Sequence, residues 1–228
     1  MTLDIEEKEE IVTSLTKAEI HLSGLDENWK RLVKLVGNYR PNRSMEKKEP
    51  YEELIRAVAS QQLHSKAANA IFNRFKSISN NGQFPTPEEI RDMDFEIMRA
   101  CGFSARKIDS LKSIAEATIS GLIPTKEEAE RLSNEELIER LTQIKGIGRW
   151  TVEMLLIFSL NRDDVMPADD LSIRNGYRYL HRLPKIPTKM YVLKHSEICA
   201  PFRTAAAWYL WKTSKLADYT KPVRPKKH

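Results

Sequence analysis

The sequence predicts an all-α protein, and three observations support that prediction. One stretch has apolar residues at the i, i+3, i+4, i+7 spacing of a single helix face. These residues are Tyr51, Leu54, Ile55 and Val58. Three segments pair a hydroxyl residue with a glutamate three positions later, which is the capping box of a helix start; they begin at Thr86, Thr125 and Ser133. Alternating β-branched runs, which would indicate strands, are missing. We therefore expect about eight to ten helices joined by short loops.

Length and composition fit an ordinary globular protein. The 228 residues (26.4 kDa) correspond to one large domain or two lobes sharing a core. We treat residues 1–228 as a single helical domain. No apolar run approaches the ~18–20 residues that span a bilayer, and the acidic N-terminus does not resemble a signal peptide. Secretion and a membrane partner are therefore disfavoured.

The two cysteines, Cys101 and Cys199, are too few for a zinc-finger quartet or a four-thiolate iron–sulfur cluster. We expect two inert, buried thiols, with a disulfide between them as the alternative. The segment Pro41–Pro50 is interpreted as a basic linker between an N-terminal helical piece and the main body, and Gly121–Pro124 as a second connection. Residues 217–228 are interpreted as a basic, disordered tail, with a nuclear-import signal as the alternative function.

The charge is unevenly distributed. The whole chain carries +5, but residues 1–30 hold eight acids against three lysines, which leaves +10 on the remainder. A basic body favours a polyanionic partner, nucleic acid first. The alternative, a solvated surface without a partner, is equally compatible with charge alone.

The first informative motif joins two predicted helices through Gly146 and Gly148. Two glycines one residue apart make a tight hairpin that allows a ligand to approach the backbone closely. The N–H groups at the start of the next helix then favour a phosphate, and Lys145 and Arg149 add charge on either side. The alternative is an ordinary helix–helix linker that uses glycine as a C-cap.

Two further motifs follow along the chain. Asp169 and Asp170 precede a helical pattern, where either could be an N-cap or a carboxylate that stabilises positive charge. Arg203 and Thr204 open a helix that contains small residues and then aromatic ones, including Trp211. Packing in the core is the alternative role for that tryptophan.

Together these motifs resemble the helix-hairpin-helix base-excision DNA glycosylases. The hairpin Gly146–Gly148 followed by Asp170 is the signature pair, and Pro201–Ala205 is closest to the 3-methyladenine DNA glycosylase II (alkylbase) family, in its compact fungal form. The resemblance spans about residues 50–215. It implies two helical lobes around a cleft, with the helix-hairpin-helix at about residues 134–160.

The resemblance assigns chemistry to individual positions. It selects Asp170 over Asp169 as the catalytic carboxylate. Trp150 stands where bifunctional relatives carry a lysine, which implies a hydrolase without strand cleavage. Trp150, Trp211 and Phe158 match positions that line the base pocket.

The same resemblance implies a DNA interface. Gln62 would fill the gap left by the extruded nucleotide, Leu63 would plug the opposite strand, and His64 would lie against the minor groove. A polar surface turn is the alternative for Gln62 and His64. The remaining DNA-binding positions are Lys145, Gly146, Gly148, Arg149, Thr151, Arg203 and Thr204.

The resemblance also implies what the chain would bind and what it lacks. The carbonyls of Thr142, Ile144 and Ile147 would hold a monovalent cation, Na⁺ or K⁺, at the hairpin. No organic cofactor is expected. About 50 residues precede the matched region, which leaves no room for the N-terminal β domain of larger bacterial relatives.

These expectations converge on hydrolytic release of alkylated purines, such as 3-methyladenine and 7-methylguanine, from duplex DNA. We expect a monomer, because one damaged site needs no two-fold partner, and a nuclear protein if the source is eukaryotic or a cytoplasmic one otherwise. A non-catalytic binder of damaged or abasic DNA on the same fold is one alternative. A generic helical DNA-binding module and a glycosylase for oxidised or mismatched bases are the others.

Overall fold

The structure, a computed structural model, describes residues 17–41, 48–61, 63, 65–79 and 84–219, which form helices joined by loops. These residues form two compact units. The middle unit comprises the described part of Arg43–Asn161, and the terminal unit comprises the described parts of Met1–Asn42 and Arg162–His228. Every regular element among the described residues is a helix, which confirms the all-α prediction.

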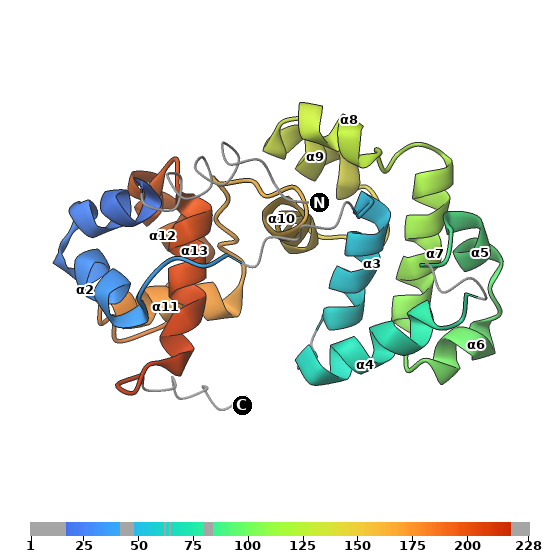
Figure 1. The fold of residues 1–228 in the computed structure, drawn as a ribbon, viewed down its shortest axis with the longest axis horizontal. Helices are drawn as coiled ribbons and strands as arrows, with labels where there is room; N and C mark the ends of the chain where they lie inside the picture. Colours follow the sequence, from blue (N-terminus) through green and yellow to red (C-terminus); the bar gives the residue numbers. More distant parts are fainter. Residues whose placement is uncertain (1–16, 42–47, 62, 64, 80–83, 220–228) are drawn as a thin grey trace, which may run out of the picture. The chain divides into compact units, whose positions relative to one another are not determined.

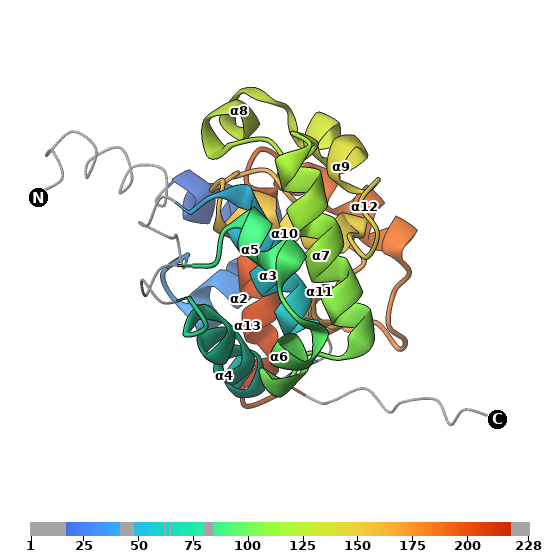
Figure 2. The same cartoon turned by 90° about the vertical axis from the view of Figure 1, so that its right-hand side faces the viewer.

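The middle unit is organised around α7. Its helices are α3 (Pro50–Ser60), α4 (Ser65–Lys76), α5 (Pro87–Asp92), α6 (Phe95–Ala100), α7 (Ala105–Ile119), α8 (Lys126–Arg131), α9 (Asn134–Leu141) and α10 (Arg149–Phe158). Figure 1 shows α3 between α10 and α7, and Figures 1 and 2 both show α5 and α6 along one side of α7. The apolar face predicted in α3 is buried at Leu54, Ile55 and Val58. Helix α10 is also apolar and largely buried, so the hairpin before it is attached to a firm core.

The terminal unit joins both ends of the chain. It contains a helix whose described part is residues 17–25, together with α2 (Glu27–Val36), α11 (Leu171–Leu180), α12 (Lys189–His195), η1 (Glu197–Cys199), α13 (Arg203–Lys212) and η2 (Thr213–Lys215). Helices α11 and α13 approach closely at Gly176, where an added Cβ would lie 2.7 Å from the Leu210 carbonyl oxygen. Only glycine allows that approach without a shift of the backbone.

The sequence suggested an N-terminal helical piece separated from the main body by a linker. In the structure this piece packs into the terminal unit. Trp29 of α2 is fully buried and meets Tyr177 of α11 edge to face, with ring centroids 6.4 Å apart. Leu32 is buried in the same cluster as Tyr209 of α13. The apolar face of α2 therefore completes the core of helices that lie more than 130 residues further along the chain.

Several local predictions are confirmed and one count is wrong. Capping boxes form at all three predicted helix starts, α5, α8 and α9. Both cysteines are free and buried. The expected eight to ten helices are too few, because the described residues alone contain the twelve α-helices α2 to α13. Helices α6 and α12 have only six and seven residues, which is too short for apolar periodicity to reveal them.

The remaining expectations concern membranes and three parts of the chain. No helix among the described residues is long and apolar enough to cross a bilayer. Gln62, His64 and positions 220–228 of the expected tail lie outside the described residues.

Candidate functional site

The hairpin between α9 and α10 is fixed by its first glycine. Gly146 has φ +88°, in the left-handed region, and a Cβ added there would lie 2.1 Å from the Ser110 hydroxyl oxygen of α7. Ile144 and Ile147 on either side are buried. Both the backbone conformation and the close contact with α7 therefore require glycine at position 146.

The second glycine has a different environment. Gly148 is the N-cap of α10, with φ −99° and ψ 169°, and a Cβ added there meets no heavy atom of the described part of the chain within 4 Å. No side chain among the described residues caps α10. The fold itself does not need glycine at position 148, so the missing side chain leaves space in front of the first turn. The helix dipole and the N–H groups of that turn favour an anion there.

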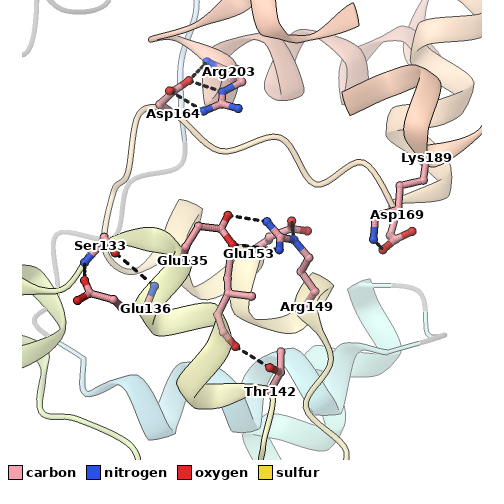
Figure 3. Close-up of polar contacts among 11 residues, drawn as sticks. Ser133, Glu135, Glu136, Thr142, Arg149, Glu153, Asp164, Asp169, Lys189 and Arg203 are labelled. Carbon is pink, nitrogen blue, oxygen red and sulfur yellow. Dashed lines mark hydrogen bonds and ion pairs between the residues drawn. The ribbon is translucent and has the colours of Figure 1, made fainter. Parts of the chain in front are cut away.

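The cations beside the hairpin are paired with acids. Arg149 donates from Nη1 and Nη2 to the two carboxylate oxygens of Glu135, at 3.2 and 2.7 Å, and from Nε to Glu153 Oε1 at 3.0 Å (Figure 3). Glu135, with Glu153 contributing less, raises the pKa of Arg149. Lys145 Nζ lies 3.6 Å from Asp109 Oδ2 at the surface. The sequence predicted that Arg149 adds positive charge beside the hairpin for DNA. The structure shows acids from α9 and from the next turn of α10 around its guanidinium, and the contact with DNA stays a prediction.

The loop after α3 is connected to the same hairpin. Gln61 Nε2 donates to the hydroxyl of Thr151 at 3.3 Å, and Thr151 is itself buried in the first turn of α10. Lys107 of α7 donates from Nζ to the carbonyls of Ala59 and Gln61, at 2.8 and 3.0 Å. Burial lowers the pKa of Lys107. Leu63, two residues after Gln61, is 41% exposed, as a residue that inserts into DNA needs to be.

The sequence analysis did not identify Lys107 or Glu153. It placed Gln61 in the segment that resembles a minor-groove loop but gave it no role of its own. The partners of these three residues lie between 4 and 90 residues away along the chain. Only the Arg149–Glu153 pair, at the helical spacing i, i+4, left a signal that could have been found.

The aromatic positions of the middle unit are Trp150 and Phe158, near the two ends of α10. Both side chains are half-buried. Trp150 follows Arg149 in the first turn, next to the hairpin. Each ring therefore combines support from the core with some accessible surface, which suits a residue that packs against a ligand.

Two adjacent acids in the terminal unit have separate partners. Asp170 is the N-cap of α11, and its Oδ1 accepts from the backbone N–H groups of Ser172 and Ile173 at 2.7 and 3.1 Å. Asp169 instead pairs with Lys189 Nζ at the surface (Figure 3). The cap bonds hold the Asp170 carboxylate in one orientation, so the capping interpretation and the catalytic one are compatible.

The start of α13 is anchored within the terminal unit. Arg203 makes a two-pronged pair with Asp164, from Nε to Oδ1 at 2.7 Å and from Nη2 to Oδ2 at 2.8 Å (Figure 3). This pair lowers the pKa of Asp164. The hydroxyl of Thr204 is buried, donates to the Arg162 carbonyl at 2.7 Å and accepts from Val165 N–H at 3.1 Å. These bonds hold residues 162–165 in place, and the expected contact of Arg203 and Thr204 with DNA stays a prediction.

The predicted residues are thus divided between the two units. The hairpin, Leu63, Trp150 and Phe158 belong to the middle unit. Asp170, Arg203, Thr204 and Trp211 belong to the terminal unit, where Trp211 is half-buried against the core.

The carbonyls expected to bind a cation lie on the hairpin. Thr142 is the C-cap of α9, where helix carbonyls lack a partner within the helix, and Ile144 O accepts from Ile147 N at 3.0 Å while keeping a second lone pair. Such oxygen donors suit a hard monovalent cation. The described residues contain no group of three or more histidine, cysteine, aspartate or glutamate side chains that could hold a metal.

Comparison with known proteins gives a consistent family. The model of the HhH-GPD superfamily base excision DNA repair protein matches residues 55–201. The chain is 45% identical over 201 residues to the alkylbase DNA glycosidase-like protein mag2 of Schizosaccharomyces pombe, covering 88% of this chain and 94% of that protein. It is 30% identical to the putative DNA-3-methyladenine glycosylase YfjP of Bacillus subtilis, covering 72% of this chain and 58% of that protein.

Solved structures agree with the sequence relatives. A DNA-3-methyladenine glycosidase from Bacillus halodurans superposes with a TM-score of 0.73 at 31% identity, covering 86% of this chain and 88% of that one. A 3-methyladenine DNA glycosylase from Archaeoglobus fulgidus has a TM-score of 0.71 at 25% identity, covering 96% and 79%.

Proposed function

The chain belongs to the HhH-GPD superfamily of base excision DNA repair proteins, and we propose that it is a monofunctional DNA glycosylase for alkylated purines in duplex DNA. The similarity to glycosylases and glycosidases named for alkylated bases supports the substrate class. The observation that carries the proposal is the carboxylate of Asp170, fixed by two cap bonds at the start of α11, 22 residues after the hairpin glycine Gly148.

The substrate explains the aromatic positions. A glycosylase must take its target base out of the stack to reach the glycosidic carbon. Alkylation at N3 or N7 places positive charge on a purine and makes it a better leaving group. The face of Trp150 would attract that cation with about 0.5–2 kcal/mol, and Trp211 and Phe158 would complete the lining of the base pocket.

Asp170 would act on the sugar. When the glycosidic bond breaks, its electron pair leaves with the base and positive charge develops on the sugar ring. A fixed carboxylate stabilises that charge and guides water to the anomeric carbon. The water adds its oxygen to that carbon and loses a proton, which leaves an abasic site in an intact strand.

The middle unit would bind the DNA. The open first turn of α10 suits a backbone phosphate, and Lys145 adds a nearby positive charge. Leu63 would plug the opposite strand of the duplex. Its neighbours would act beside it, with Gln62 in the gap left by the extruded nucleotide and His64 against the minor groove. A Na⁺ or K⁺ ion on the carbonyls of Thr142, Ile144 and Ile147 would add positive charge at this phosphate.

Trp150 also supports the absence of lyase activity. By the resemblance it occupies the position of the lysine that attacks the sugar in bifunctional relatives. An indole has no amine with which to form a Schiff base. We further propose a nuclear, monomeric protein that needs no organic cofactor.

The test is base release from a methylated duplex. Free 3-methyladenine or 7-methylguanine should appear while the strand stays intact until alkali is added. Borohydride should trap no covalent protein–DNA complex. Tight binding to abasic DNA without base release would contradict the proposal and favour a non-catalytic binder, and cleavage without alkali would contradict the monofunctional assignment.

A further inference from the structure

A buried acid lies one turn beyond the hairpin. Glu153 of α10 is 4% exposed, and it is the one charged residue in the buried class among the described residues. A carboxylate removed from water is strongly unfavourable unless an opposite charge and hydrogen bonds compensate it. Phosphates approaching the start of the same helix would add repulsion if this charge were not compensated.

Arg149 supplies that compensation with its whole guanidinium. Nε is used by Glu153, while Nη1 and Nη2 are used by Glu135, so all three nitrogens face carboxylates (Figure 3). Glu135 belongs to the first turn of α9 and Glu153 to the second turn of α10. Arg149 therefore connects the two helices on either side of the hairpin.

The charges around the hairpin do not add up to a basic patch. Arg149 faces two acids, and Lys145 faces Asp109. These five side chains together carry a formal charge of −1. These five side chains therefore supply no net positive charge for a phosphate. Its attraction would rest mainly on the backbone N–H groups and the dipole of α10, in front of the space that Gly148 leaves open, together with the cation proposed at the hairpin.

On the basis of the function proposed above, we infer that Arg149 is a positioning residue and makes no contact with DNA phosphate. It neutralises Glu153 and clamps α9 to α10, so that the first turn of α10 is held rigidly for the phosphate. Its effect on DNA binding is indirect and depends on the presence of Glu153.

A double-mutant cycle tests this role. The variants are Arg149→Met, Glu153→Gln and the two together, all in the full chain. Arg149→Met removes the guanidinium that donates to the buried Glu153 carboxylate and should lower the unfolding midpoint by roughly 5–15 °C. The double variant removes both charges and should recover most of that loss. A double variant as unstable as Arg149→Met alone would overturn the clamp.

The salt dependence of DNA binding separates positioning from phosphate contact. Each phosphate contact contributes about 0.9 to the slope of log K against log salt. For a duplex with a stable abasic-site analogue, the double variant should keep the wild-type slope between about 50 and 200 mM salt. A slope shallower by about 0.9 in a folded double variant would show that Arg149 binds phosphate and would overturn the inference. If the wild type itself bound no DNA, the proposed function would fail, and the unfolding cycle would still decide whether the clamp exists.

Discussion

Helices α10 and α11 begin in opposite ways. The start of α10 is Gly148, which offers no side chain to its first turn, whereas the start of α11 is Asp170, whose carboxylate accepts from two of its own N–H groups. Both ends favour negative charge through the helix dipole. In α11 that preference holds an internal carboxylate in place, whereas no side chain of the described residues caps α10. Under the proposed function, the start of α10 would receive a phosphate and the start of α11 would orient the catalytic carboxylate.

The largest expected effect is on the rate of base release and comes from Asp170, the N-cap of α11. Asp170→Asn should lower the rate of base release by about 10²–10³-fold, because it removes the charge that stabilises the developing cation. Folding should persist, since asparagine is as good an N-cap as aspartate. Release of 3-methyladenine from methylated duplex, followed over time, measures this effect.

Asp169→Asn is the matched control. Asp169 pairs with Lys189 at the surface, whereas Asp170 caps α11. Exposed ion pairs contribute only about 0–1 kcal/mol to stability. The rate should stay within about fivefold of the wild type. Equal losses in the two variants would show that the carboxylate at position 170 has no special role.

Substitutions of the two hairpin glycines, Gly146 and Gly148, should have different effects on stability and on DNA binding at the start of α10. Gly146→Ala should destabilise the protein by about 2–3 kcal/mol, because φ is +88° and the new methyl would lie 2.1 Å from the Ser110 oxygen. Denaturant unfolding measures this loss. A variant as stable as the wild type would mean that the hairpin is not fixed against α7.

Gly148→Ala should weaken DNA binding and change stability little, in contrast to Gly146→Ala. Stability should change by no more than about 1 kcal/mol, because the added methyl meets no atom of the described residues within 4 Å. Affinity for duplex DNA should fall by about tenfold, since the methyl would displace a phosphate from charge-assisted N–H bonds. Unchanged affinity would argue against a phosphate at this helix start.

The smallest effect is a pH dependence in the terminal unit. Arg203 lowers the pKa of Asp164 in the folded state, so the pair stabilises the fold fully above the ordinary pKa of the carboxyl. That stabilisation is lost as the pH falls through the lowered pKa. Asp164→Asn should therefore reduce the unfolding midpoint at neutral pH and flatten its decline in acid.

Asp92→Asn is the control for this prediction. Asp92 also pairs with a neighbouring arginine, Arg91, and also has a lowered pKa, but the pair lies at the surface. Because water screens this exposed pair, its removal should flatten the pH profile of the unfolding midpoint much less than Asp164→Asn does. Equal flattening by both substitutions would show that the Asp164 pair has no special place in the fold.

Interactions within one helical turn could be predicted from the sequence. The capping boxes at Thr86, Thr125 and Ser133 formed as expected, because donor and acceptor are three residues apart. The same local rule limited the N-cap of α11 to Asp169 or Asp170, and in the structure it is Asp170. The spacing of the hairpin glycines predicted a tight turn, but only the structure shows the positive φ of Gly146 and its contact with Ser110.

Interactions between distant segments could not be predicted in this way. Glu135 lies 14 residues before Arg149, so the pairing of that arginine depends on how α9 and α10 pack. Thr204 bonds to Arg162, 42 residues away, and α2 packs with α11 and α13 across most of the chain. A single sequence gives the residue types at these places but not which of them meet.

Single-turnover base release at increasing protein concentration tests the contrast between α10 and α11 most directly. The wild type, Gly148→Ala and Asp170→Asn would be compared on one methylated duplex. Gly148→Ala should need more protein for half-saturation and still reach nearly the wild-type maximal rate. Asp170→Asn should half-saturate at the wild-type concentration with its maximal rate lowered by about 100-fold or more. A maximal rate in Asp170→Asn equal to that of the wild type would contradict the account.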